Sequence, residues 1–366
     1  MKRIEYPALM VDHEKFRENI RIVTEKCREN GIVVAGVIKA TNGMSRIAED
    51  FVSSGAELVA SSRLEQLERA ADATTGVPLL DIRIPMLSEV PDVIRIADIS
   101  LNSEIKVIRA LNEEALRQRK LHKVILMADL GDLREGYMDH DELIEVALEI
   151  ENEMEGLELA GIGTNLGCYG SVKPSAINMN QLAELAERVE IAIGRELEYV
   201  SGGASSSMMP LLDGVMPRKI NMLRIGALAY TGCLDDIRLA YGYEWADCMN
   251  GDAFTLRAEV IEKKVKPTHP IGELGVDAFG KKQVYEDKGD RMRVLLAVGR
   301  ADFGDIDDIL PELPGSYVVG ASGDHTILDI EDCEVKPEIG DVIEFRLKYS
   351  GLLRLSGSEN VKVYNR

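Results

Sequence analysis

The sequence predicts an α/β protein that consists of an N-terminal TIM-type (β/α)8 barrel followed by a mostly β C-terminal domain. From residue 12 to about residue 232, eight short apolar runs rich in β-branched residues alternate with amphipathic helical stretches, which is the pattern of parallel strands joined by helices. Each run ends in polar or Gly-rich residues, as expected of a strand that is buried on both faces and followed by a loop. After Cys233 the helical periodicity gives way to strand-like segments punctuated by Gly, Pro and Asp.

The eight apolar runs are the predicted barrel strands. They span residues 33–40, 56–63, 77–85, 98–103, 122–131, 157–165, 197–205 and 220–227. The stretches between them are predicted helices, of which the first has Asp12 as its N-cap and Gly31 as its stop, and a later one has Asp141 as its N-cap. Eight strand–helix units in roughly 230 residues are typical of a closed barrel, although an open doubly wound sheet has the same periodicity.

The segments after Cys233 indicate a second domain. Its predicted strands lie in residues 252–267, 291–302, 315–330 and 340–349. No repeat, low-complexity tract or Ser/Gly linker separates the two parts of the chain. The sequence therefore predicts a barrel domain at residues 1–238, whose first residues are able to pair with the second domain, and a β domain at residues 239–366.

Composition excludes several classes of protein. The chain has 366 residues, of which 45% are hydrophobic and 29% charged, as in an ordinary globular protein. Its 63 acidic and 43 basic residues leave a net charge of −20, which argues against nucleic acid and anionic membranes as partners. No apolar run reaches the ~18 residues that a membrane span needs. The first residues lack the apolar h-region of a signal peptide, so we expect none.

The cysteines favour a reducing compartment. They are odd in number and scattered, with no C-x-x-C pair that would indicate a metal site or a redox dithiol. We therefore expect reduced thiols, a cytoplasmic protein and no bound metal. The five are Cys27, Cys168, Cys233, Cys248 and Cys333.

Catalytic residues of such a barrel belong at the carboxyl ends of its strands. Lys39 ends the first strand, where burial of its stem lowers the ammonium pKa and favours a nucleophilic amine; a surface lysine at a strand–loop junction is the alternative. Arg134 follows the fifth strand among several acids, and either binds an anionic ligand or joins an ion-pair network. After the sixth strand, Asn165, Cys168 and Tyr169 supply polar groups in a Gly-rich segment that either approaches a ligand or forms a tight turn.

The loops after the seventh and eighth strands predict a phosphate site. In SGGASSSMMP, two glycines precede Ser205 and Ser206, and the eighth strand contributes Arg224 and Gly226. Backbone N–H groups and hydroxyls at such a junction bind phosphate well, and the two adjacent loops are the usual phosphate site of these barrels. A capped turn is the alternative. No nucleotide-binding Gly-rich motif stands in the matching context.

These segments carry a resemblance to a known family. With x for a position that varies, the lysine of VIKA and the segments DLGDLREG, GIGTNLxCYG, SGGxSSS, LRIG, DAFGK, VGRxD, GASxDHxILD and GDVIEFRLKYSGLL occur in this order in proteins resembling the ornithine racemases. Those enzymes belong to the pyridoxal 5'-phosphate (PLP) enzymes of the alanine racemase fold, fold type III. The similarity covers essentially the whole chain and implies a PLP-dependent amino-acid racemase, acting on ornithine or another diamino acid.

The resemblance also implies residue roles. Lys39 would form the internal Schiff base with PLP and serve as the base on one face of the substrate, and Arg224 would face the pyridine nitrogen. Ser205, Ser206 and the backbone at Gly226 and Ala227 would hold the phosphate. Arg134 would lie near the ring hydroxyl or the substrate carboxylate. The complete set of candidate cofactor-binding residues is Lys39, Arg134, Asn165, Ser205, Ser206, Arg224, Gly226 and Ala227.

A racemase needs a second base on the opposite face of the α-carbon. Alanine racemases supply a tyrosine from a Gly-Tyr-x-Asp segment of the partner subunit, but the comparable segment here has Arg300, which is no general base. Asp324 and His325 of the partner subunit are the candidate catalytic residues, with Cys168 and Tyr169 behind them. A site shared in this way would require a homodimer.

Three departures from the family pattern bear on the substrate. Related racemases usually read SGGNSSS, RIGE and GASSDH, whereas this chain has Ala204, Ala227 and Gly323 at the differing positions. If the glutamate of RIGE recognises a basic side chain, its loss predicts another amino acid or weak ornithine activity. The alternatives are another reaction on this fold (a decarboxylase, aldolase or dehydratase) or a non-catalytic PLP-binding protein, a group that lacks the β domain.

Overall fold

The chain forms two compact units. A computed structural model describes residues 3–232, 237–276, 280, 282 and 284–366, so Cys233 and most of the DAFGK segment lie outside the described residues. The barrel unit comprises Phe16–Met249, and the sheet unit comprises Met1–Lys15 together with Asn250–Arg366. The boundary predicted between residues 238 and 239 precedes the junction at Met249.

The strands of the barrel unit form a closed ring of eight in sequence order, all of them parallel. The closed ring confirms the predicted barrel and excludes the open doubly wound sheet. Each strand falls within one predicted apolar run. The strands are β2 (Val33–Val37), β3 (Leu58–Ser61), β4 (Leu79–Asp81), β5 (Ile99–Asn102), β6 (His122–Met127), β7 (Leu157–Gly163), β8 (Tyr199–Ser201) and β9 (Met222–Ile225).

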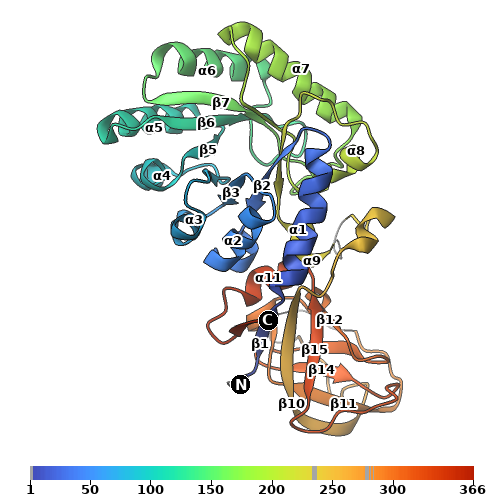
Figure 1. Ribbon diagram of the computed structural model, residues 1–366. Helices are drawn as coiled ribbons and strands as arrows, with labels where there is room; N and C mark the ends of the chain where they lie inside the picture. The colour runs from blue at the N-terminus through green and yellow to red at the C-terminus, as the bar shows by residue number, and fades with distance from the viewer. Residues whose placement is uncertain (1–2, 233–236, 277–279, 281, 283) are drawn as a thin grey trace. The chain divides into compact units, whose positions relative to one another are not determined.

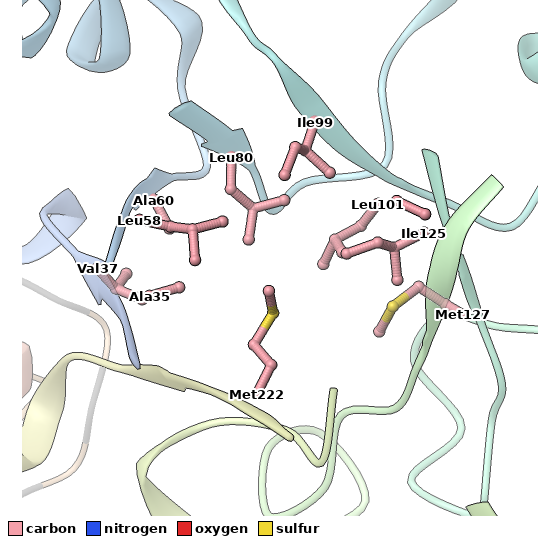
Figure 2. Packing of buried hydrophobic residues seen from close by; sticks show 11 residues of the cluster. Ala35, Val37, Leu58, Ala60, Leu80, Ile99, Leu101, Ile125, Met127 and Met222 are labelled. Atoms are coloured by element: carbon pink, nitrogen blue, oxygen red, sulfur yellow. The ribbon is translucent and has the colours of Figure 1, made fainter. Parts of the chain in front are cut away.

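Apolar side chains fill the interior of the ring. Alternate residues of a strand point to the same face, and the inward-facing ones converge in the middle of the barrel, as Figure 2 shows. The interior is therefore a packed core, which leaves binding and chemistry to the strand ends. The buried members of this core are Ala35, Val37, Leu58, Ala60, Leu80, Ile99, Leu101, Ile125, Met127, Ala160 and Met222.

Helices surround the ring of strands (Figure 1). They are α1 (His13–Arg28), α2 (Ser45–Ser53), α3 (Leu64–Ala71), α4 (Val90–Ile96), α5 (Ile105–Gln118), α6 (His140–Glu153), α7 (Ala176–Ile193), α8 (Met208–Leu212) and α9 (Ala227–Thr231). None of the helices in the described ranges combines the length and apolarity that a membrane span requires.

Two of the predicted helix ends are confirmed and one is wrong. Asp12 Oδ1 accepts from the N–H of Lys15 at 3.1 Å and caps α1, and Gly31 lies beyond the end of α1 with a φ of +71°, which glycine adopts readily. Asp141 is not an N-cap, because it already lies in the first turn of α6. The side chain of Asp139 accepts from the N–H groups of the first turn instead.

The sheet unit is mostly β, as predicted. Its sheet has the order β12-β15-β10-β11-β14-β13, and β1 pairs antiparallel with β10 and parallel with β16. The predicted strand at 315–330 is a hairpin of two strands. The elements are β1 (Ala8–Val11), β10 (Phe254–Pro267), β11 (Asp290–Leu296), α10 (Arg300–Phe303), β12 (Ile309–Pro311), β13 (Tyr317–Ala321), β14 (Thr326–Asp329), β15 (Val342–Leu347), α11 (Tyr349–Leu355) and β16 (Lys362–Asn365).

Candidate active site

The barrel brings eight of the ten predicted site residues to the mouth formed by the carboxyl ends of its strands. Lys39 follows β2 directly and opens a short 3-10 turn (Lys39–Thr41). Arg134 lies in the loop after β6, and Asn165 in the loop after β7. Ser205 and Ser206 belong to the 3-10 turn after β8, whereas Arg224, Gly226 and Ala227 lie in or just after β9.

Lys39 is a partly buried amine with no hydrogen-bond partner among the described residues. Burial lowers its pKa most. The positive charges of Arg134 and Arg224 lower the pKa further, while Cys168 and Glu135 raise it. Because the net shift is downward, this position favours the neutral amine, which is the nucleophilic and basic form.

Arg224 is a buried cation that is held in place by its neighbours. Its guanidinium donates to Ser201 Oγ at 2.5 Å, to the carbonyl oxygen of Thr164 at 3.0 Å and to Asn165 Oδ1 at 3.3 Å. Burial lowers its pKa to about 10, so the side chain keeps its charge at neutral pH. The contacts orient Arg224 across the ends of β7, β8 and β9.

Arg134 forms an ion pair with the adjacent Glu135, and these hydrogen bonds raise the pKa of Arg134. Its remaining terminal nitrogen donates to Cys168 Sγ at 2.9 Å. The other acids of this loop have a structural role, since Asp129 accepts from the N–H groups of Gly131 and Leu133. Of the acids near Arg134 in the sequence, Glu135 is therefore its ion-pair partner.

Hydrogen bonds link the 3-10 turn Ser205–Ser207 to the start of α9. Ser205 Oγ accepts from the N–H groups of Gly226 at 3.2 Å and Leu228 at 3.3 Å, and Ser206 Oγ donates to the carbonyl oxygen of Leu166 at 2.9 Å. The N–H groups of Ser205 and Ala227 have no acceptor among the described residues. Free N–H groups on two adjacent loops fit a phosphate.

Two further observations show that this end of the barrel fits a ligand such as PLP. Gly203 has a φ of +116°, and a Cβ at this position would lie 2.7 Å from Ser207 Oγ, so only glycine lets the backbone turn here. Asn165 Nδ2 is a buried donor with no partner among the described residues. A buried donor of this kind is normally satisfied, and a bound group at the mouth would satisfy it.

Sequence reasoning missed Tyr230. This buried tyrosine in α9 donates from its hydroxyl to the carbonyl oxygen of Val37 at 3.0 Å and stacks on Phe16 with ring centroids 5.0 Å apart. It thereby joins α9, which begins with Ala227, one of the residues predicted to bind phosphate, to the end of β2, just before Lys39. In the sequence, Tyr230 was marked only by its place in LRIGALAYTG, the segment that follows the eighth predicted strand.

Asp324 and His325 lie in the sheet unit, on the exposed turn between β13 and β14. The turn is stabilised by hydrogen bonds between Ser322 and His325. A further hydrogen bond links this turn to α10, because the backbone N–H of Arg300 donates to the carbonyl oxygen of Ser322 at 2.8 Å. The structure thus places the two candidate bases beside the segment that replaces Gly-Tyr-x-Asp, and their catalytic role stays a prediction.

Comparison with known proteins agrees with this arrangement. The family described as alanine racemase, N-terminal domain, matches residues 11–233. The chain is 41% identical over 357 residues to ornithine racemase from Acetoanaerobium sticklandii, covering 98% of this chain and 99% of that protein. It is 36% identical over 361 residues to lysine racemase from Thermotoga maritima, covering 98% of each.

A solved structure has the same fold. Alanine racemase from Streptomyces lavendulae superimposes with a TM-score of 0.77 and 16% sequence identity, over 100% of this chain and 98% of that chain. The family match covers most of the barrel unit, and the curated relatives align from end to end. We conclude that this chain belongs to the alanine racemase family.

Proposed function

We propose that this protein is a PLP-dependent racemase of a basic diamino acid. One observation carries the proposal: the amine of Lys39, with its lowered pKa, shares the barrel mouth with the N–H groups of Ser205 and Ala227 and a buried guanidinium. Neither the amine nor these N–H groups have a hydrogen-bond partner in the part of the chain that the structure describes. An amine that is free to react, an anion site and a fixed cation are what this cofactor and an amino acid require. The curated relatives, an ornithine and a lysine racemase, support the reaction and the substrate class.

The residues that would hold the cofactor follow from their contacts. Lys39 Nζ would bind its aldehyde carbon, and the N–H groups of Ser205 and Ala227 would bind its phosphate. When bound, PLP supplies an electron-withdrawing ring that acidifies the α-proton of the amino acid. Arg224, fixed by Ser201 and Thr164, would face the ring nitrogen and, as a permanent cation, keep that nitrogen unprotonated.

Side chains of the protein would carry out the proton transfers at the α-carbon. The neutral amine of Lys39 would take the α-proton from one face of the substrate, or return it there as an ammonium group. Arg134 would bind the substrate carboxylate or the ring hydroxyl. For the opposite face, the resemblance to alanine racemases points to Asp324 and His325 of a partner subunit in a cytoplasmic homodimer, and Cys168 and Tyr169 of this chain are the alternatives.

The substrate proposal rests on what the two curated relatives have in common. Ornithine and lysine each carry a second ammonium group at the end of an aliphatic chain, so a basic diamino acid is the shared class. Ala227 replaces the glutamate found in related racemases, and this difference predicts weaker activity on ornithine than on a diamino acid of another chain length.

The test is α-proton exchange in heavy water by the PLP-loaded protein. The panel contains L- and D-ornithine, lysine, arginine, alanine and serine, and product chirality is read alongside deuterium incorporation. We expect exchange with inversion for the diamino acids, faster for lysine than for ornithine. Exchange with inversion for alanine alone would overturn the substrate class. No exchange with any member, by protein that retains PLP, would overturn the racemase itself.

A further inference from the structure

Cys168 combines an accessible thiol with a fixed position in the site. It is an exposed free cysteine in the loop after β7, and its Sγ accepts from the guanidinium of Arg134 at 2.9 Å. The same guanidinium is held from its other side by Glu135. The sulfur is therefore held at a defined point while it remains open to a ligand.

The backbone around Cys168 is fixed on both sides. Asp132, in the loop that carries Arg134, accepts through Oδ1 from the N–H groups of Cys168 at 3.4 Å and Val172 at 3.1 Å. Gly170 packs so closely that a Cβ there would lie 2.5 Å from the carbonyl oxygen of Asp132. The start of the loop is bound to Ser206 in the phosphate site. The thiol is thus positioned by the loops after β6 and β8.

Lys39 and Cys168 approach the mouth from different sides of the ring. Lys39 follows β2 and Cys168 follows β7, and the two strands are separated by β8 and β9 on one side of the barrel and by four strands on the other. Arg134 links the two sides of the mouth, because its guanidinium donates to Cys168 Sγ at 2.9 Å and its charge also lowers the pKa of Lys39. In the loop that carries Cys168, the unpartnered and buried Asn165 Nδ2 marks a place for a ligand.

We propose that Cys168 is the second acid–base group of this site and acts on the α-carbon from the face opposite Lys39. The inference rests on the proposed racemase function and deepens it, because it places both proton-transfer groups on one chain. Tyr169, the neighbouring alternative, has 74% of its surface exposed and no contact that would aim it at the mouth among those the structure describes.

The proton balance needs no other reactant. In one direction Lys39 takes the α-proton, the bonding electrons stay on the substrate, and the S–H of Cys168 gives its proton to the opposite face, which leaves a thiolate. In the reverse direction the thiolate takes the α-proton and the Lys39 ammonium gives its own. Thiol and thiolate are the acid and base forms of one side chain, so each turnover in one direction prepares the reverse turnover.

The first experiment separates exchange from inversion. In heavy water, the wild-type protein should convert either enantiomer of the substrate into its mirror image. In Cys168→Ser and Cys168→Ala, Lys39 remains, so one enantiomer should still exchange its α-proton with retention, while inversion falls about 10²- to 10⁴-fold. Cys248→Ser removes an exposed thiol that contacts the carbonyl oxygen of Trp245, and this control should racemise normally.

Two outcomes would overturn the inference. If Cys168→Ser inverts the substrate at the wild-type rate, another group is the second base. If both enantiomers lose exchange equally while PLP binding weakens, Cys168 is structural. A wild-type protein that exchanges no α-proton at all would instead refute the proposed function, and the inference with it.

The second experiment does not depend on turnover. Iodoacetamide alkylation of Cys168 and Cys248 is quantified by peptide mass spectrometry, for protein without ligand and for protein saturated with PLP and substrate. The ligands should protect Cys168 and leave Cys248 equally reactive. Equal alkylation of Cys168 with and without the ligands would place it outside the site and overturn the proposal.

Discussion

The two basic side chains at the centre of the site, Arg224 and Lys39, differ in how their donors are used. Arg224 directs its guanidinium at Ser201, Thr164 and Asn165, whereas the amine of Lys39 donates to none of the described residues. A group that several acceptors hold is oriented, and an amine with free donors is available to react. The contacts therefore support the proposed roles, in which Arg224 positions the cofactor and Lys39 reacts.

Replacement of Lys39 by alanine should abolish catalysis without unfolding the barrel. The amine makes no hydrogen bond to any residue that the structure describes, so circular dichroism should be unchanged. We expect α-proton exchange to fall by at least about 10²-fold, with loss of covalently held PLP after borohydride reduction. The control is Lys123→Ala on β6, which removes an ion pair with Glu198 and should retain activity. Exchange at the wild-type rate by Lys39→Ala would show that another group binds PLP and removes the α-proton.

Replacement of Arg224 by lysine should destabilise the protein despite the retained charge. A single ammonium group cannot reproduce the planar fork that reaches Ser201 Oγ and the carbonyl oxygen of Thr164. The free energy of unfolding in urea should fall by about 1–3 kcal/mol, the cost of leaving a buried acceptor unsatisfied. Arg188→Lys, at an exposed pair with Asp141, is the matched control, and an equal effect of both substitutions would contradict the prediction.

The ends of the parallel strands also carry structural groups. At the end of β4, buried Asp81 accepts through Oδ1 from the N–H of Arg83 at 3.2 Å, while its Oδ2 has no partner among the described residues. Burial raises the pKa of Asp81 from 3.8 to about 7. A polar residue at a strand end is thus not enough to indicate catalysis, because this one closes the turn into the loop after β4.

Asp81 should make the stability of the protein depend on pH. The pKa of Asp81 is higher in the folded state than in the unfolded state. The contribution of Asp81 to the free energy of unfolding is therefore fully present below about pH 4, where the carboxyl is protonated in both states, and is lost as the pH rises towards 7. The full loss is about 4 kcal/mol. In urea titrations at pH 4 to 8, Asp81→Asn should show a flatter stability profile than the wild type. Asp92→Asn, at an exposed ion pair, should not, and parallel profiles for Asp81→Asn and the wild type would refute the prediction.

The sheet unit is assembled from both ends of the chain. β1 lies between β10 and β16, and all four of its residues are buried. Periodicity in the sequence revealed β10, β11 and β15, but not β1, β12 or β16. Those strands have three or four residues, too few for a periodic signal, and their existence depends on partners far away in the sequence.

Truncation of a side chain near the N-terminus should therefore weaken the C-terminal part of the molecule. Leu9 in β1 is completely buried, so Leu9→Ala should reduce the free energy of unfolding by about 2–5 kcal/mol. Hydrogen exchange should show the loss of protection in β10 and β16, which pair with β1. Leu353→Ala changes a leucine that is 42% exposed and should have little effect. Unchanged protection of β16 in Leu9→Ala would show that β1 does not stabilise this sheet.

The local pattern of residues was enough to predict the barrel, the β domain and the strand-end positions of Lys39 and Arg224. These features depend on apolar periodicity and on residues that are neighbours in the chain. The partners of the site residues were beyond prediction. Arg134 contacts Cys168, Arg224 reaches Thr164, and Tyr230 holds the end of β2. Each of these contacts joins segments that are distant in sequence and meet only when the eight strands close into a ring.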